Sequence, residues 1–193
     1  MTSRAALIEA KQLEAVKNMK SFLATILGGA LIAIVATGAI AQQSTNRVAA
    51  KTDWSVFVED DPTECWAVSS PKETVNTKDG RVVAVRRSEI LLFVSFRPGS
   101  GIKSELSFTG GYPFAAGSTV TAQIGNNTYE FFTSGENAWP ATAADDAKII
   151  TAMKRGAEVL ITGRSGRGTV TKDKFSPLGF TAAVEEAAKR CAN

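Results

Sequence analysis

Short runs rich in β-branched and aromatic residues follow one another from Trp54 to Phe175, and turn residues separate them. Two of these runs, 119–124 and 128–132, are joined by Gly-Asn-Asn, residues that tolerate a positive φ and favour a hairpin. Another run, Ile90–Val94, is almost continuously apolar, which predicts a central strand buried on both faces. Many short strands with frequent turns are typical of antiparallel β-sandwiches and barrel-like domains, so we expect a mostly β fold of this kind.

Two segments replace this strand pattern with the spacing of amphipathic helices. The first, at about 145–155, begins with two aspartates, has an apolar stripe and ends in Lys-Arg-Gly, which suits the opposite partial charges of the two helix ends. The second, at about 180–191, repeats apolar residues at helical spacing. We therefore expect two short helices packed on the sheet, with Cys191 on the face that contacts it.

Three further hairpins are expected: 54–58 with 65–69, 81–87 with 90–97 about Ser88-Glu89, and 158–163 with 168–175. The polar, glycine-containing stretch 70–80 is expected to link the first of these hairpins to the second.

An uncharged apolar stretch runs from Ser21 to Ala41, with two lysines before it and Ala-Ile-Ala at its end. A basic start, an apolar centre and an A-x-A site predict a cleaved signal peptide over residues 1–41. Met19 reads as its natural start, so we expect residues 1–18 to come from an upstream start codon. Because about 20 apolar residues are also enough to span a bilayer, an uncleaved anchor in the inner membrane is the alternative.

The part that would remain after cleavage is nearly neutral. Residues 1–41 hold four of the 22 basic and two of the 19 acidic side chains, so the net charge falls from +3 to +1. We expect a flexible lead-in over 42–51 and one β domain over 52–193, which is long enough for a sizeable core. The basic residues are neither clustered nor interleaved with aromatic residues, so nucleic acid is not expected as a partner.

The chain contains no histidine. This excludes a Ser-His-Asp triad, a Cys-His pair, imidazole metal ligands and an imidazole pH switch. We expect no catalytic residue, no metal and no cofactor.

The two cysteines, Cys65 and Cys191, both lie in the part expected to be exported. An oxidising compartment makes a structural disulfide between them the default expectation. A redox pair or a single reactive thiol is the alternative, although no C-x-x-C motif and no histidine is present to activate either sulfur.

The glycine-rich segment 163–168 contains Arg164 and Arg167 and resembles a phosphate-binding loop only in composition, because strands and no helix are expected on both sides of it. We expect a hairpin turn with two exposed arginines. These arginines are the first candidates for binding an anionic surface such as lipid headgroups or glycans, and Arg86-Arg87 is the second. Trp139, expected between a strand and a helix, is interpreted as a lid on the core, with partner binding as the alternative.

Carboxylates gather in two places, the acidic run 59–64 and Asp145-Asp146. Such groups are suited to calcium or to a glycosidase acid–base pair. The run lacks the spacing of an EF-hand loop, so we interpret it as a solvated hairpin turn, and the adjacent aspartates suit the start of a helix. Composition alone leaves a Ser-Lys hydrolase open as an alternative.

Several segments resemble one bacterial family when taken in order: Trp54, Cys65, Ala138-Trp139-Pro140, the helix end AMKRG at 152–156, FSPLGFTAA at 175–183 and the terminal Cys191. Over most of 52–192 the chain resembles the invasion-associated locus B family of exported proteins. The resemblance implies a periplasmic, secreted or outer-membrane-associated β-sandwich-like domain, linked in some bacteria to host-cell invasion. Many relatives carry additional cysteines near 134–139, and their absence here leaves Cys65–Cys191 as the only candidate pair.

These observations predict a non-enzymatic exported domain that binds an envelope or host protein, a glycan or a lipid, with no membrane span after signal cleavage. An envelope hydrolase using carboxylates or a Ser-Lys pair is the alternative. Two ionisable groups converging in a deep cleft would favour the hydrolase, whereas a surface patch of arginine and tryptophan would favour binding. The sequence contains no signal for an oligomeric state.

Overall fold

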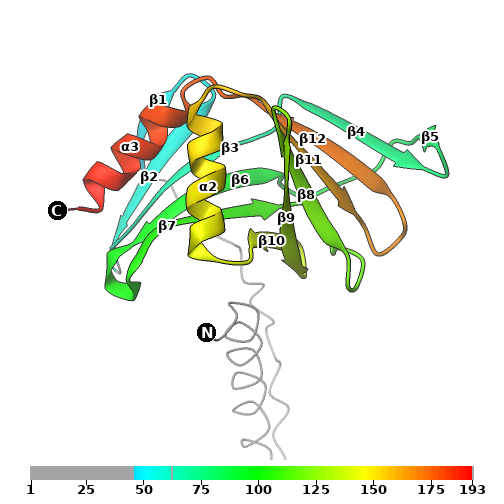
Figure 1. Ribbon diagram of the computed structural model, residues 1–193, viewed down its shortest axis with the longest axis horizontal. Coiled ribbons are helices and arrows are strands. Elements are labelled where there is room, and N and C mark those ends of the chain that lie inside the picture. The colour runs from blue at the N-terminus through cyan, green and yellow to red at the C-terminus, as the bar shows by residue number, and fades with distance from the viewer. Residues whose placement is uncertain (1–45, 62, 193) are drawn as a thin grey trace, which may run out of the picture. The chain divides into compact units, whose positions relative to one another are not determined.

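The computed structural model describes residues 46–61 and 63–192, which form an antiparallel sheet of 12 strands and two α-helices (Figure 1). The predicted signal peptide and residues 42–45 of the expected lead-in lie outside the described residues. The strands are β1 (Arg47–Lys51), β2 (Trp54–Asp60), β3 (Thr63–Ser69), β4 (Glu73–Lys78), β5 (Arg81–Val82), β6 (Leu91–Arg97), β7 (Ile102–Thr109), β8 (Thr119–Ile124), β9 (Asn127–Ser134), β10 (Asn137–Pro140), β11 (Val159–Arg164) and β12 (Val170–Phe175). A short 3₁₀ helix, η1 (Pro98–Ser100), joins β6 to β7.

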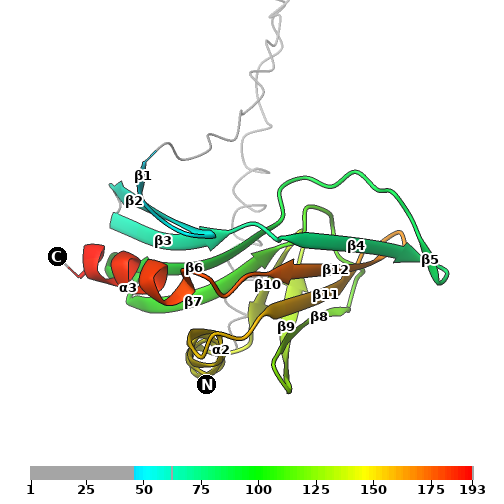
Figure 2. The same cartoon turned by 90° about the horizontal axis from the view of Figure 1, so that it is seen from above.

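The sheet bends so that its two parts face each other across the core. Its strand order is β1-β2-β3-β6-β7-β10-β9-β8-β11-β12-β4-β5. Although four strands separate β7 from β12 in this order, the rings of Phe108 and Phe175 from these two strands meet edge to face, with centroids 6.1 Å apart. Figure 2 shows β1–β3 at one end of the sheet and β4–β5 at the other, and these ends do not pair with each other in the described part of the chain. The expected mostly β, sandwich-like fold is confirmed, and the sheet is not a closed barrel.

Alternation of apolar and polar residues explains which face of each strand is buried. In β8, Val120, Ala122 and Ile124 are buried, and the residues between them are at least partly exposed. Strand β6 lies between β3 and β7, as expected for a central strand. The expectation that it is buried on both faces is wrong, because Leu91 and Phe93 remain partly exposed on the outer face.

Both expected helices are present: α2 is Ala143–Lys154 and α3 is Phe180–Arg190. Helix α2 begins with a reciprocal cap, in which the Thr142 hydroxyl accepts from the Asp145 amide at 3.2 Å and donates to the Asp145 carboxylate at 2.6 Å. The neighbouring Asp146 is fully buried and accepts a hydrogen bond from the Leu106 amide at 3.0 Å. The second aspartate therefore anchors the helix to β7, a role that the sequence interpretation did not include.

Three segments differ from the sequence expectations. Arg47–Lys51, expected to belong to the flexible lead-in, forms β1 on β2. Segment 70–80, expected to be a link, contains β4, which pairs with β12. The expected hairpin of 81–87 with 90–97 is wrong, because β5 pairs with β4 whereas β6 pairs with β3 and β7. Strands β1 and β4 are largely exposed and lie at or near the ends of the sheet, where backbone pairing needs no apolar alternation.

The segment before α3 is held closely against the start of the domain. The Trp54 indole donates to the Ser176 carbonyl at 3.0 Å, and the Asp53 amide donates to the Leu178 carbonyl at 3.2 Å. Gly179 has a φ of +88°, and a Cβ there would overlap the Lys51 carbonyl. Glycine at this position thus allows the C-terminal helix to begin directly against β1.

Candidate functional site

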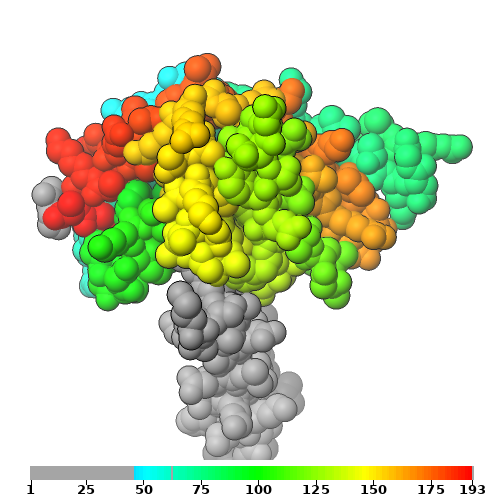
Figure 3. Space-filling model, in the orientation of Figure 1, coloured from blue at the N-terminus to red at the C-terminus, as the bar shows by residue number. Residues whose placement is uncertain are grey.

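A cleft of about 640 Å³ lies beside the connection between β5 and β6. We call this connection, residues 83–90, the strap. The cleft is lined by strap residues 84–87, by 111–113, and by Glu136 and residues of the β11–β12 hairpin. In Figure 2 the strap is the long loop that leaves β5 and returns to β6, and Figure 3 shows β4 and β5 projecting beyond β12. The volume falls in the range typical of ligand pockets, about 300–1,000 Å³.

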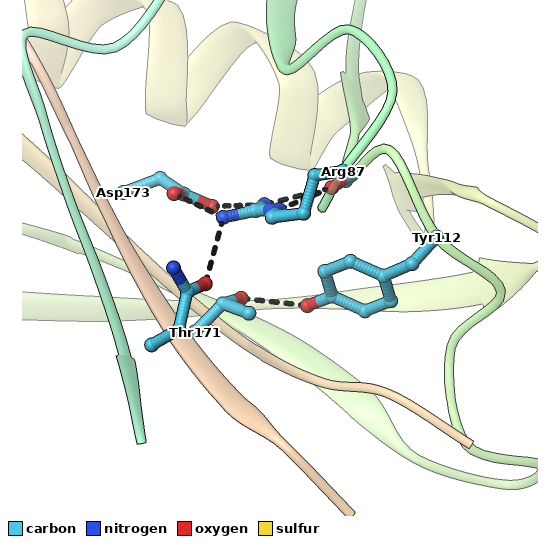
Figure 4. Close-up of polar contacts among 6 residues, drawn as sticks. Arg87, Tyr112, Thr171 and Asp173 are labelled. Carbon is cyan, nitrogen blue, oxygen red and sulfur yellow. Dashed lines mark hydrogen bonds and ion pairs between the residues drawn. The ribbon is translucent and has the colours of Figure 1, made fainter. Parts of the chain in front are cut away.

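Arg87 fixes the strap to the body of the domain (Figure 4). Its guanidinium donates two hydrogen bonds to the Asp173 carboxylate, at 2.7 and 2.6 Å, and two to the Gly110 carbonyl, at 2.9 and 2.7 Å. A longer bond of 3.4 Å reaches the Asn76 side chain, and the guanidinium lies 5.0 Å from the centre of the Tyr112 ring. The two charged side chains are only 5% and 0% exposed, so this ion pair is buried.

Burial raises the pKa of the Asp173 carboxyl above its usual range, while the hydrogen bonds and charge of Arg87 oppose the rise. Burial also raises the pKa of Tyr112, whose hydroxyl shares a 2.6 Å hydrogen bond with Thr171. Tyr112 is therefore a neutral hydroxyl at physiological pH, and it packs beneath Arg87 as a hydrogen-bonded wall of the cleft.

A second contact, through the backbone, holds the strap close to the turn that follows β7. The Ser88 amide donates to the Gly111 carbonyl at 3.0 Å. Gly111 has a φ of +72°, and a Cβ there would lie 2.7 Å from the Ser88 carbonyl oxygen. Only glycine fits this turn without displacing the strap.

The candidate arginines from the sequence lie in different environments. Arg167 is exposed in the β11–β12 turn and lines the cleft together with the exposed Arg86. Arg164 is exposed at the end of β11 but is outside the lining residues. Arg87 belongs to the second candidate pair for binding an anionic surface, but its charge is neutralised by the Asp173 carboxylate. The structure thus brings together Arg86 and Arg167, which are far apart in the sequence, and the hairpin expected around 163–168 is confirmed.

Trp139 belongs to β10 and not to a loop, which corrects its expected position. It is partly exposed and stacks on Phe132 of the neighbouring strand, with ring centroids 5.5 Å apart. It does not line the cleft, so any partner contact through Trp139 would involve another surface.

Sequence reasoning missed the Arg87–Asp173 pair, although one signal was available. In β12 the residues Thr171, Asp173 and Phe175 alternate on the buried face. An aspartate at an inward position of a strand requires a buried partner, since an unpaired buried charge is very costly. That partner lies 86 residues away in the chain, so the pattern indicates a missing cation without identifying it.

The expected disulfide between Cys65 and Cys191 is confirmed, with Cα atoms 5.8 Å apart. It links β3 to the residue that follows α3, and both sulfurs lie in the core. The expected side of the helix is also confirmed, because Cys191 faces the sheet.

In the acidic run 59–64, Glu59 and Asp60 at the end of β2 pair with Glu64 and Thr63 at the start of β3, so the expected hairpin is confirmed. Glu64 accepts a 2.6 Å hydrogen bond from Arg97, which also donates to Glu105 at 3.0 Å. Within residues 46–61 and 63–192, no cluster of three or more acidic or cysteine side chains has the arrangement of a metal site. No helix in this part of the chain has the length and apolar character needed to cross a membrane.

The fold and its cross-link define a disulfide-linked, mostly β domain with a cleft at one end of the sheet. The family model described as Invasion associated locus B (IalB) protein matches residues 54–188, well over half of the chain. The protein belongs to this family, an exported bacterial family that is not known as one of enzymes. Searches of curated proteins and of solved structures gave no match.

Proposed function

We propose that this protein is an exported, non-enzymatic domain that binds an anionic ligand at the cell envelope through the cleft beside the strap. The observation that carries the proposal is the meeting of Arg86 and Arg167 on the walls of one ligand-sized cleft. Arg87 is neutralised by Asp173, so it positions the strap and leaves Arg86 and Arg167 as the cations that a ligand would meet. Charge-assisted hydrogen bonds from arginine suit carboxylate, phosphate and sulfate groups.

The polar groups of the cleft support binding over hydrolysis. Glu136 is the one carboxylate among the lining residues, whereas glycoside hydrolysis uses a pair of them. The Ser165 hydroxyl accepts a 3.1 Å hydrogen bond from the Thr169 amide, so it has a structural role in its turn. Arg164 and Trp139 lie outside the cleft, so the proposal gives them no contact with the ligand.

Replacing both cleft arginines is expected to weaken binding to a polyanion. Arg86→Gln combined with Arg167→Gln removes two donors of charge-assisted hydrogen bonds, each worth about tenfold in affinity. Binding of the purified exported protein to dextran sulfate, with neutral dextran as reference, measures this loss. Added salt should reduce wild-type binding and have less effect on the double variant.

Arg164→Gln is the matched control, because Arg164 is also exposed and lies on the same hairpin as Arg167, but outside the cleft. It should retain most of the binding. If the double variant binds dextran sulfate as tightly as the wild type, or if Arg164→Gln has the larger effect, the cleft is not the anion site.

Export to the envelope predicts a defined N-terminus. If residues 1–41 act as a signal peptide, the mass of the protein recovered from the periplasmic or secreted fraction should correspond to a chain that begins at Gln42. A membrane-bound product that retains residues 21–41 would contradict cleavage and indicate an anchored protein. The disulfide of the folded domain agrees with an oxidising compartment.

A further inference from the structure

The strap contains backbone groups that the rest of the described chain leaves unused. Its two ends are bonded, through the Val83 amide to the Asn76 carbonyl at 2.9 Å and the Ser88 amide to the Gly111 carbonyl at 3.0 Å. Between these anchors, residues 84–86 neither donate nor accept a backbone hydrogen bond within the described residues. All three are exposed, and all three line the cleft. A row of unpaired amides and carbonyls is what an incoming strand requires.

The side chains around this row suit an acidic peptide. Arg86 and Arg167 supply two positive charges, and Glu136 supplies one negative charge, so the cleft has a positive excess once Arg87 is paired. Val85, 41% exposed, and the ring of Tyr112 offer apolar contacts between the charges. Alternate side chains of a strand point to opposite sides, so one set can reach the arginines while the other faces solvent.

We propose that the ligand is an extended acidic peptide segment of a partner protein, added as a β-strand along residues 84–86. Its backbone pairs with the free amides and carbonyls of the strap, and its carboxylates pair with Arg86 and Arg167. This inference rests on the proposed function of the cleft and specifies the partner class. A lipid headgroup or an anionic glycan would use the two charges but would leave the alternating backbone donors and acceptors of the strap unmatched.

The test begins with a phage-displayed library of random decapeptides selected on the immobilised exported protein. Enriched peptides are expected to alternate acidic and apolar residues. In synthetic copies, N-methylation of alternate backbone amides should weaken binding about tenfold or more in one of the two registers, because each blocked amide loses its bond to the strap. Bound peptide should slow hydrogen exchange of the amides of residues 84–86.

Two variants of the protein connect the peptide to the cleft. Arg86→Gln with Arg167→Gln should weaken the selected peptides, whereas Arg164→Gln should not. The proposal is overturned if no peptide is enriched above an unrelated protein, if both N-methylated registers bind as well as the parent, or if exchange is slowed elsewhere.

Two anionic probes, phosphatidylglycerol vesicles and dextran sulfate, distinguish failure of the peptide inference from failure of the proposed function. If either binds in a manner that depends on Arg86 and Arg167 while no peptide is enriched, the cleft is an anion site and the peptide inference fails. If neither these probes nor any peptide depends on the two arginines, the proposed function fails as well.

Discussion

Replacing Arg87 with methionine is expected to lower the free energy of unfolding at neutral pH by about 3–5 kcal/mol, because it leaves a buried carboxylate without its partner. The Asp173 side chain is fully buried. Arg87 donates two short hydrogen bonds to its carboxylate and two to the Gly110 carbonyl. Urea denaturation followed by tryptophan fluorescence measures the change. Arg86→Met is the matched control and should change stability by no more than about 0.5 kcal/mol, since Arg86 is exposed.

A second substitution distinguishes a missing partner from lost packing. Combining Arg87→Met with Asp173→Leu removes both charges, and such replacements of buried pairs are often neutral. Much of the stability should therefore return in the double variant. An Arg87→Met protein that unfolds at the wild-type urea concentration would show that the pair does not hold the strap.

The effect of Arg87→Met should also depend on pH. The folded protein holds the Asp173 proton more tightly than the unfolded chain, because burial raises the pKa. The stability that protonated Asp173 contributes is therefore lost as pH rises from its pKa in the unfolded chain to its pKa in the folded protein. Above that range the free energy of unfolding no longer changes with the titration of this group. Without Arg87 the folded pKa rises further and the range extends upward. The difference between variant and wild type should be smaller at about pH 4 than at about pH 7, and a difference that is equal at both pH values would contradict the buried charge as its cause.

Removing the disulfide is expected to lower the free energy of unfolding by about 2–5 kcal/mol. The bond joins residues 126 positions apart, and in the chain-entropy model a loop of about 100 residues corresponds to about 4.7 kcal/mol. Replacing Cys65 and Cys191 together with alanine avoids an unpaired thiol, and urea denaturation measures the loss. Because both cysteines are buried, the folded wild type should resist mild reductant.

The fully reduced wild type serves as the control for the cysteine substitutions. After unfolding and refolding in reductant, it should show the same loss of stability as the double alanine variant within the small difference due to packing. If the variant and the oxidised wild type unfold at the same urea concentration, the disulfide constrains the unfolded chain much less than its loop length implies.

The elements predicted correctly are those whose signals are local. Helix α2 follows from its two N-terminal aspartates, its apolar stripe and its Lys-Arg-Gly end, and the β8–β9 hairpin follows from its Gly125-Asn126 turn. Strand β4 was missed because its outer positions face solvent, so its burial pattern does not alternate. Its place in the sheet depends on β12, and no local pattern in the sequence indicates a partner so distant.

The cleft could be predicted only in part for the same reason. Arg167 and Arg86 are both candidates from the sequence for binding an anionic surface, but their convergence depends on the strap, whose position is set by Arg87, Asp173 and Gly111. The contacts of these residues join segments that are distant in the sequence. The sequence therefore indicates arginines suited to an anion, but only the tertiary fold brings them together in one cleft.

The sheet order has a consequence for the time course of folding. Strand β4 pairs with β12 through contacts such as that between Thr77 and Val170, which are 93 residues apart. The disulfide joins Cys65 to Cys191, which follows the C-terminal helix. Folds with such high contact order form slowly, because long loops must close before their contacts stabilise them. The β4–β5 end of the sheet can join the other strands only after β12 has been synthesised, and the Cys65–Cys191 cross-link can form only after α3, so the domain is completed late.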